Sequence, residues 1–443
     1  MKKFFASVGL AALGASTLQA QYAPGITPDQ TANPRGWSVA AALRGFYDDN
    51  YLTLPNGLAR SSYGTEVSPS ATFNHTVNNT TITLSYVYDW RYYETTSTSQ
   101  SSHQFNGDVK QNFSERFSMR ASDSFVIAQE PTVIDTAIIS SPLYTEGNNV
   151  HNTGTLSATA GLTPKLDLQA SYANNLYAYE QTFGDVYNPN PAVNPLTPSR
   201  SAILDRMEQL ATLNLNWKIL SELTGVLGYS YGHVGYTSPE PIIFAGAPPQ
   251  TFGNPANVLS KIRDNDSHFF FVGADEAFTS QLNGSIRVGG EYLDYYNVHS
   301  SDTSPYVDAS LTWTYMKESY LQSGVMHQHS ATDVTGGIPP TTGPNAGKPV
   351  LDAETTAAYL SVNQKIAGGF TGGLLGQFQH SAFNGGTVNS ESEDFFIVGM
   401  NFAYRFTPYF GAEAGYNWNK LVSDVSGRDY TRNMVYLGVR ATY

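Results

Sequence analysis

The side chains of TITLSYVYDWRYY, residues 81–93, alternate in character from one position to the next, and this alternation indicates the fold class. The even-numbered positions, which include Leu84 and Trp90, are all aliphatic or aromatic. Most odd-numbered positions are polar, among them Asp89 and Arg91. Successive side chains of a β-strand point to opposite faces, so this stretch predicts a strand with one apolar and one polar side.

The same alternation returns along the chain, for example in MEQLATLNLNW (207–217) and YFGAEAGYNWN (409–419), and about 18 such stretches can be counted. Short turns and long polar loops join them in turn. The short turns lie at residues 77–79, 113–115, 163–165, 218–222, 278–281, 316–319, 366–369 and 407–409. This organisation predicts an all-β fold, a transmembrane antiparallel up-and-down β-barrel of about 18 strands, with 16–18 possible, short periplasmic turns and long extracellular loops.

The last strand supports the same fold. In RNMVYLGVRATY (432–443), the apolar residues Val435, Leu437 and Val439 share one face with the terminal Tyr443. This pattern is typical of the terminal strand by which outer-membrane proteins are recognised for assembly. We therefore expect the barrel-assembly machinery to be a partner, through the strand that ends at Tyr443.

The N-terminus predicts export. Lys2 and Lys3 precede a short apolar run, and small residues follow, which indicates a secretory signal peptide over residues 1–20. Residues 21–35 are then a periplasmic lead-in and residues 36–443 the barrel. The chain beyond the signal has no apolar run long enough for a transmembrane helix. The expected location is the cell outer membrane of a Gram-negative-type envelope.

The composition fits a wall that has lipid on one side and water on the other. The chain has 29 Tyr and 23 Phe, whereas charged residues make up only 14%. Cysteine is absent, which excludes disulfides and thiolate chemistry. The net charge of −13 argues against a nucleic-acid partner, because such binding depends on neutralising phosphates.

Three segments resemble a known family. GWSVAAALRGFYDDNY (36–51), SATAGLTPKLDLQASY (157–172) and FAYRFTPYFGAEAGYNW (402–418) look like the putative β-barrel porin-2 family of outer-membrane proteins. The resemblance implies an outer-membrane barrel with porin-like or surface-polysaccharide export roles. It implies no catalytic residue.

Charged residues on the polar faces are candidates for lining the lumen, because an Arg or Lys on the lipid face costs about 2–4 kcal/mol at mid-bilayer. They are Arg44, Asp89, Arg91, Asp108, Lys110, Arg120, Asp167, Glu208, Arg287, Glu291, Asp308, Arg405, Glu413 and Arg440. One interpretation is a wet pore in which opposed charges act on passing solutes. The other is that these side chains satisfy one another in salt bridges. Both stay open at this point.

Aromatic residues near strand ends are candidates for the membrane interfaces, where an amphipathic ring prefers the headgroup level. They are Trp37, Trp90, Trp217, Trp313, Trp418 and Tyr443. An alternative is a sugar-binding aromatic surface inside the lumen. The parity of Trp90, Trp217 and Trp418, which fall on apolar faces, favours the interfacial interpretation.

No stretch predicts a catalytic residue, a metal site or a cofactor. His327 and His329 lie on one strand face but lack a third ligand nearby. The acidic segments RDND (263–266) and Asp48–Asp49 have no ligand spacing of a calcium loop, so we interpret them as solvated loop carboxylates. Ser, His and Asp residues are present, but no pattern singles out a triad.

Two stretches fit the alternation poorly. Asp123, in FSMRASDSFVI, takes the parity of the lipid face, and HFFFVGADE (268–276) shows no clear inner face. A β-bulge or a shifted register near either would explain the mismatch.

The sequence favours a passive channel for small hydrophilic solutes with a polar, charge-lined lumen. The alternatives are a barrel for polysaccharide or surface-polymer export, and a structural or adhesive barrel that acts through its long outer loops. An outer-membrane enzyme comes last. The other expected partners are outer-membrane lipid and lipopolysaccharide, and the oligomeric state is open between monomer and trimer.

Overall fold

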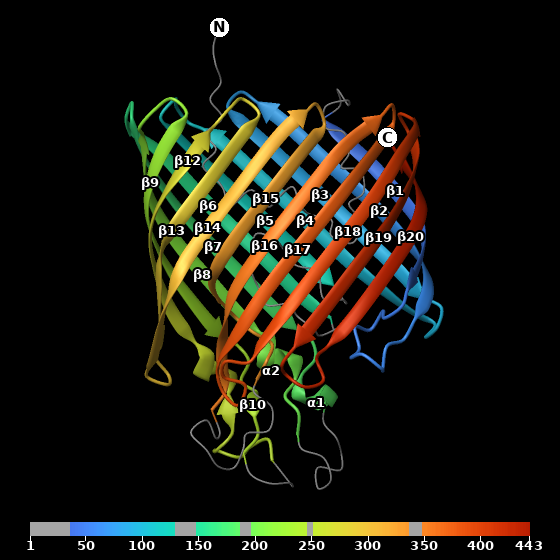
Figure 1. Cartoon of the computed structure of the whole chain (residues 1–443), viewed down its shortest axis with the longest axis vertical. Coiled ribbons are helices and arrows are strands. Elements are labelled where there is room, and N and C mark those ends of the chain that lie inside the picture. Colours follow the sequence, from blue (N-terminus) through green and yellow to red (C-terminus); the bar gives the residue numbers. More distant parts are fainter. Residues whose placement is uncertain (1–35, 129–147, 187–195, 246–250, 336–347) are drawn as a thin grey trace.

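The computed structural model describes residues 36–128, 148–186, 196–245, 251–335 and 348–443. These residues form one antiparallel sheet of 18 strands that closes on itself (Figure 1). Each strand pairs with its neighbours along the chain, β9 pairs with β12, and β20 returns to β1. The predicted β-barrel is therefore confirmed. The signal peptide (1–20) and the lead-in (21–35) lie outside the described residues.

The barrel strands agree closely with the alternating stretches of the sequence. They are β1 (Trp37–Asp48), β2 (Ser62–Val77), β3 (Thr80–Tyr93), β4 (Thr98–Asn112), β5 (Phe117–Ala128), β6 (Asn149–Thr163), β7 (Leu166–Tyr179), β8 (Arg206–Lys218), β9 (Leu223–Tyr236), β12 (Asn265–Ala277), β13 (Leu282–Tyr295), β14 (Ser300–Met316), β15 (Ser319–Ser330), β16 (Val350–Ala367), β17 (Phe370–Gly385), β18 (Ser392–Thr407), β19 (Phe410–Ser423) and β20 (Tyr430–Thr442). The loops carry α1 (Phe183–Val186), α2 (Arg200–Leu204), β10 (Pro241–Ile243), β11 (Val258–Leu259) and η2 (Ser260–Arg263).

The two ends of the chain close the sheet. Ala41 of β1 stands opposite Ala441 of β20. Val39 and Tyr443 exchange two backbone hydrogen bonds, of 3.0 and 2.8 Å between nitrogen and oxygen. A sheet without a free edge leaves no ladder group unpaired in lipid, where an unpaired group costs several kcal/mol.

The wall is apolar outside and polar inside. Leu43 and Leu437 are 52% and 69% exposed on the outer face, whereas Arg44, one residue along β1, is 4% exposed on the inner face. The same alternation continues through the paired strands. No helix among the described residues is long and apolar enough to cross a membrane.

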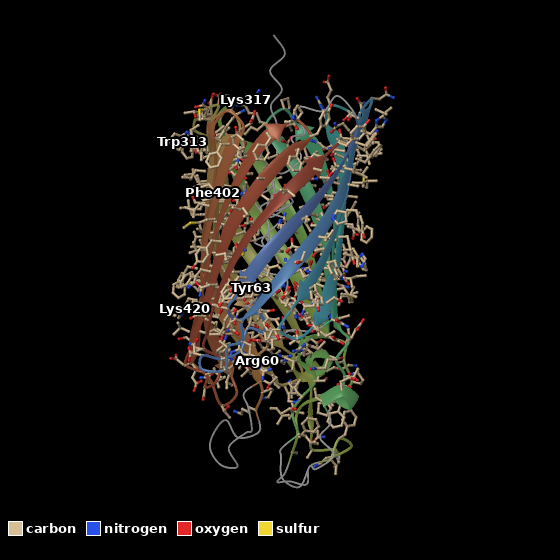
Figure 2. The ribbon with its side chains drawn as sticks, turned by 90° about the vertical axis from the view of Figure 1, so that its right-hand side faces the viewer. Arg60, Tyr63, Trp313, Lys317, Phe402 and Lys420 are labelled. Carbon is tan, nitrogen blue, oxygen red and sulfur yellow. The ribbon has the colours of Figure 1, made fainter. Side chains whose placement is uncertain are left out.

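The two ends of the barrel differ. Figure 1 shows the short turns at one end and the long connections, with α1, α2 and β10, at the other. The barrel is narrower in Figure 2 than in Figure 1, so its cross-section is oval. From the loop lengths, we take the long-loop end as extracellular.

The inner face is covered near the long loops and accessible further from them. In β7, Tyr177 and Tyr179 lie beside the long loops and are buried, whereas Gln169 near the short turn is partly exposed. Leu210 of β8 also faces the lumen and is 39% exposed. The lumen therefore widens toward the periplasmic end.

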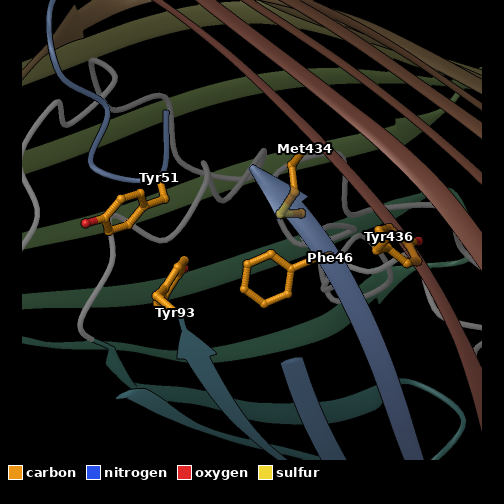
Figure 3. Packing of buried hydrophobic residues seen from close by; sticks show 5 residues of the cluster. All are labelled: Phe46, Tyr51, Tyr93, Met434 and Tyr436. Carbon is orange, nitrogen blue, oxygen red and sulfur yellow. The ribbon is translucent and has the colours of Figure 1, made fainter. Parts of the chain in front are cut away.

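Part of the covering comes from the loop between β1 and β2. Its Tyr51 packs on Tyr93 with 5.0 Å between ring centroids, and Phe46 contacts the same ring at 5.3 Å (Figure 3). Met434 and Tyr436 of β20 complete this cluster on the inner face. The extracellular half of the barrel thus has a packed apolar cluster inside the wall.

The two mismatched stretches are regular strands. The pairing of β5 with β4 and with β6 runs through Asp123 without a register shift, so the bulge that we expected there is wrong. Residues 268–276 are also in continuous register, with Phe269 and Phe271 on the inner face beside Val226. The sequence showed no inner face here because aromatic residues occupy both sides of the strand.

Candidate functional site, the lumen and its extracellular mouth

Deeply buried charges on β1, β2, β3 and β19 form one network. Arg44 of β1 stands between Glu66 of β2 and Glu413 of β19 and donates a hydrogen bond to each carboxylate. Arg91 of β3 donates to the second oxygen of Glu66, with 2.7 Å between Nε and Oε2. Arg44, Glu66 and Glu413 are each 4% exposed. Charges this deeply buried persist only when they are paired and hydrogen-bonded.

Further pairs cross neighbouring strands. Arg120 bonds to Asp108, and Arg287 reaches Asp275 with 2.7 Å between Nη2 and Oδ1. Two more pairs lie near the strand ends, between Arg206 and Glu208 at 2.7 Å and between Lys218 and Asp167 at 2.8 Å. Most of the charged side chains inside the wall thus neutralise one another.

The strand pairing places the whole set of candidate lumen residues on the inner face. Among them, Lys110, Asp308 and Arg440 have no ion-pair partner in the described part of the chain. Glu291 accepts a hydrogen bond from the backbone nitrogen of His329 at 2.9 Å. Arg405 is exposed near the short-turn end of β18. The remaining candidate, Asp89 of β3, has the parity of Arg91 and therefore faces the lumen on the same strand.

Sequence reasoning missed two members of these networks. Glu66 shares the parity of Ser68 in β2, but Thr65 and Pro69 interrupt the apolar face that would have revealed it. Asp275 lies in the aromatic-rich stretch that gave no clear inner face. In both strands the side chains alternate between the two faces, but the two faces do not differ clearly in polarity along the sequence.

Loops from distant strands meet over the extracellular mouth. Arg263 at the end of η2 is fully buried, and its Nη1 donates to the carbonyl oxygen of Thr332 at 3.0 Å. Its Nη2 donates to the carbonyl oxygen of Ile203 in α2. The guanidinium carbon lies 4.2 Å from the centroid of the Tyr236 ring. Burial lowers the pKa of Arg263 from its ordinary value.

A second arginine continues this connection. Arg428, between β19 and β20, pairs with Asp333 at 2.9 Å between Nη2 and Oδ1, and with Glu393 at 3.1 Å between Nε and Oε2. Burial alone lowers the pKa of Arg428, but the two carboxylates outweigh it and raise the pKa above its ordinary value.

We call Ile203, Arg263, Thr332, Asp333 and Arg428 the mouth clasp. It joins the loops that follow β7, β11, β15 and β19. The contacts link successive loops around the opening, from β7–β8 to β9–β12, then to β15–β16 and to β19–β20. The mouth clasp therefore holds these loops together at the extracellular end of the lumen.

The acidic loop segments are structural. Asp48 is the last residue of β1, is 0% exposed, and accepts from Arg432 with 2.8 Å between Nε and Oδ2. Asp49 accepts from the backbone nitrogen of Asn433 at 2.7 Å. In RDND, Arg263 belongs to the mouth clasp. The interpretation as solvated loop carboxylates is therefore wrong for Asp48, which is fully buried. Asp264 and Asp266 stay partly exposed, and they accept hydrogen bonds from the backbone nitrogen of Tyr236 and from the hydroxyl of Tyr231.

The two histidines of HQH take separate partners. His327 lies 3.0 Å from Glu354 between Nε2 and Oε1, and His329 lies 3.1 Å from Asp352 between Nδ1 and Oδ1. Within the described ranges, no group of three or more His, Asp or Glu side chains is placed to hold a metal ion.

The candidate interfacial aromatics occur toward both ends of the outer face. Trp37, Trp217, Trp313 and Tyr443 are 45%, 57%, 46% and 55% exposed and lie at the short-turn end, where Figure 2 shows Trp313. Trp90 and Trp418 are partly exposed on the outer face in the halves of β3 and β19 nearer the long loops.

A closed sheet with an apolar exterior, a polar interior and long loops at one end defines a porin-like outer-membrane β-barrel. Residues 232–443, from within β9 to the C-terminus, match the family model described as "Putative beta-barrel porin 2". The resemblance seen in the sequence is thus confirmed over this part of the chain. No curated protein matches the chain significantly.

Solved outer-membrane proteins show a similar overall course at low identity. Acinetobacter baumannii OccAB3 is 11% identical with a TM-score of 0.40, over 92% of this chain and 99% of that one. The Pseudomonas aeruginosa protein opdK is 8% identical with a TM-score of 0.41, over 92% and 99%. Pseudomonas aeruginosa OccK2 (OpdF), solved with glucuronate, is 9% identical with a TM-score of 0.41, over 92% and 98%.

Proposed function

We propose that the protein is a passive channel for small hydrophilic solutes across the outer membrane. The observation that carries this proposal is the polar inner wall, which is accessible to solvent toward the short-turn end of the closed sheet. An 18-stranded barrel encloses more space than side chains alone can fill. Solutes would then pass through an extracellular mouth narrowed by the mouth clasp and into a wider periplasmic half.

The paired charges favour weak charge selectivity. Around β1–β3, β19 and β20, four basic and four acidic side chains share the inner face, so their charges cancel. They are Arg44, Arg91, Arg432, Arg440, Asp48, Glu66, Asp89 and Glu413. On the opposite wall, the carboxylates Asp275, Glu291 and Asp308 outnumber Arg287, which gives this wall a slight preference for cations. Size, more than charge, is expected to select the solute.

Liposome swelling with sugars of increasing size tests this proposal directly. Purified protein in vesicles should admit monosaccharides fastest, and the rate should fall steeply for larger sugars. If monosaccharides enter no faster than in protein-free vesicles, passive diffusion is wrong and polymer export becomes the better hypothesis. Circular dichroism of the same vesicles, with a dominant β signal, shows that the protein tested is folded.

A further inference from the structure

Asp123 places a carboxylate on the outer face in the middle of the wall. Along β5, Ala121 precedes it and Phe125 follows it on the same face. Asp123 is exposed, and within the described ranges only Asn152 of β6 bonds to it through a side chain, with 2.9 Å between Nδ2 and Oδ1. Hydrocarbon offers a carboxylate no hydrogen bonds, so lipid alone is a costly environment at this position.

Asp123 is part of a polar patch. Asn152 and Asn174 also face outward, since Asn174 of β7 stands opposite Gly154, which itself stands opposite Asp123. Both amides are partly exposed. The polar patch, made of Asp123, Asn152 and Asn174, thus offers a hydrogen-bond acceptor and donors within three neighbouring strands.

A shallow hollow adjoins the polar patch on the side of β1–β4. Its volume is about 440 Å³, and Asp123 forms part of its lining. It exists because Ala71 and Gly107 are small among the larger outward residues of the wall. The larger side chains around it are Val39, Phe73, Leu84, Tyr86 and Phe105.

On the other side of the polar patch the outer face carries large aromatic and aliphatic side chains, which we call the ridge. Tyr172 of β7, Leu213 and Trp217 of β8 and Leu227 of β9 are 43%, 48%, 57% and 58% exposed. The sequence of features around the wall is therefore hollow, polar patch and ridge, from β1 to β9.

We propose that the face centred on β5 and β6 docks a second copy of this chain, related by a two-fold axis normal to the membrane. Such an axis at the polar patch turns β1–β4 of one copy toward β7–β9 of the other, so each ridge meets a hollow. It also brings Asp123 of one copy to the amide donors of the other. An acyl chain could fill the hollow, but it has no donor for Asp123, which is why a second copy fits this face better.

Single-cysteine cross-linking tests the docking face in isolated outer membranes, because the chain has no cysteine of its own. Ala121→Cys places a thiol beside Asp123 on the outer face, between Val109 and Leu156. The matched control is Ala309→Cys, which faces outward on β14 between Ile286 and Val325. With a short bis-maleimide, Ala121→Cys should give a cross-linked dimer and Ala309→Cys should not.

Several outcomes overturn the proposal. They are no dimer from Ala121→Cys, equal dimers from both variants, a product of trimer mass, and a cross-link to a different protein.

A second variant tests the polar patch itself. Asp123→Leu should raise the dimer dissociation constant in detergent about tenfold, because a charged hydrogen bond is lost. If Asp123 faced only lipid, the same change would leave the dissociation constant unaltered, which would contradict the role of the patch.

Discussion

Arg428 and Asp333 lie 95 positions apart in the chain, yet their side chains pair at 2.9 Å over the extracellular mouth. The loops that carry them leave the barrel on either side of β16–β19. We predict that Arg428→Ala increases the size of the largest sugar that enters liposomes, because Asp333 is released from the opening. Arg60→Ala, at the extracellular end marked in Figure 2, is the control and should leave the size limit unchanged. An unchanged limit in Arg428→Ala would show that the mouth clasp does not restrict passage.

We expect Arg263 to protect the extracellular loops from protease. Its two carbonyl contacts, to Ile203 and Thr332, hold separate loops together. Arg263→Met keeps the volume but removes both hydrogen bonds, so chymotrypsin added to whole cells should cleave the extracellular loops several-fold faster than in the unmodified protein. Lys317→Met, at a short turn (Figure 2), is the matched control. Equal cleavage rates in all three proteins would contradict a structural role for Arg263.

Breaking the network around Arg44 should lower the stability of the barrel. Glu66→Gln leaves Arg44 and Arg91 without their shared carboxylate, and breaking a buried ion pair costs about 3–5 kcal/mol. The free energy of unfolding, measured by urea titration in lipid vesicles, should fall by about this amount. Lys110→Met removes a lumen charge that has no ion-pair partner among the described residues, and should change it by about 0.5 kcal/mol or less. Similar losses in the two variants would show that the network is not special.

A substitution at Tyr443 can show whether this side chain acts in assembly into the membrane or in the stability of the folded barrel. Its two hydrogen bonds to Val39 use only the backbone, so Tyr443→Ala leaves the closing pair of strands intact. If the assembly machinery recognises the terminal aromatic side chain, the amount of folded protein in the outer membrane should fall several-fold, while refolding in vitro should be unaffected. Tyr409→Ala, which removes a ring 6.5 Å from that of Tyr443, is the control. Normal membrane levels of Tyr443→Ala would contradict recognition through this side chain.

The sequence predicts the barrel well because strand parity is a local property. Each lipid-facing position in TITLSYVYDWRYY can be identified without knowledge of the neighbouring strands. The short turns show where one strand ends and the next begins. Asp123 shows the limit: its parity was correct, and only the expectation of a uniformly apolar exterior made it look like a shifted register.

The mouth could not be predicted in the same way. Arg263 and Thr332 are brought together by loop conformation, which leaves no periodic signal in either segment. Asp48 looked like a loop residue because the alternation of β1 ends at an acidic pair, and its partner Arg432 lies at the other end of the chain. Contacts between distant segments form only when the barrel closes. Strand parity does not show which of these segments then meet.

Single-channel recording in planar lipid bilayers tests whether a water-filled passage runs through the barrel. We expect stepwise currents from the purified protein that are proportional to the applied voltage, show weak preference between cations and anions, and grow larger in Arg428→Ala. Protein that is folded by circular dichroism and inserted in the bilayer, yet passes no current in either form, would contradict a water-filled passage through this barrel.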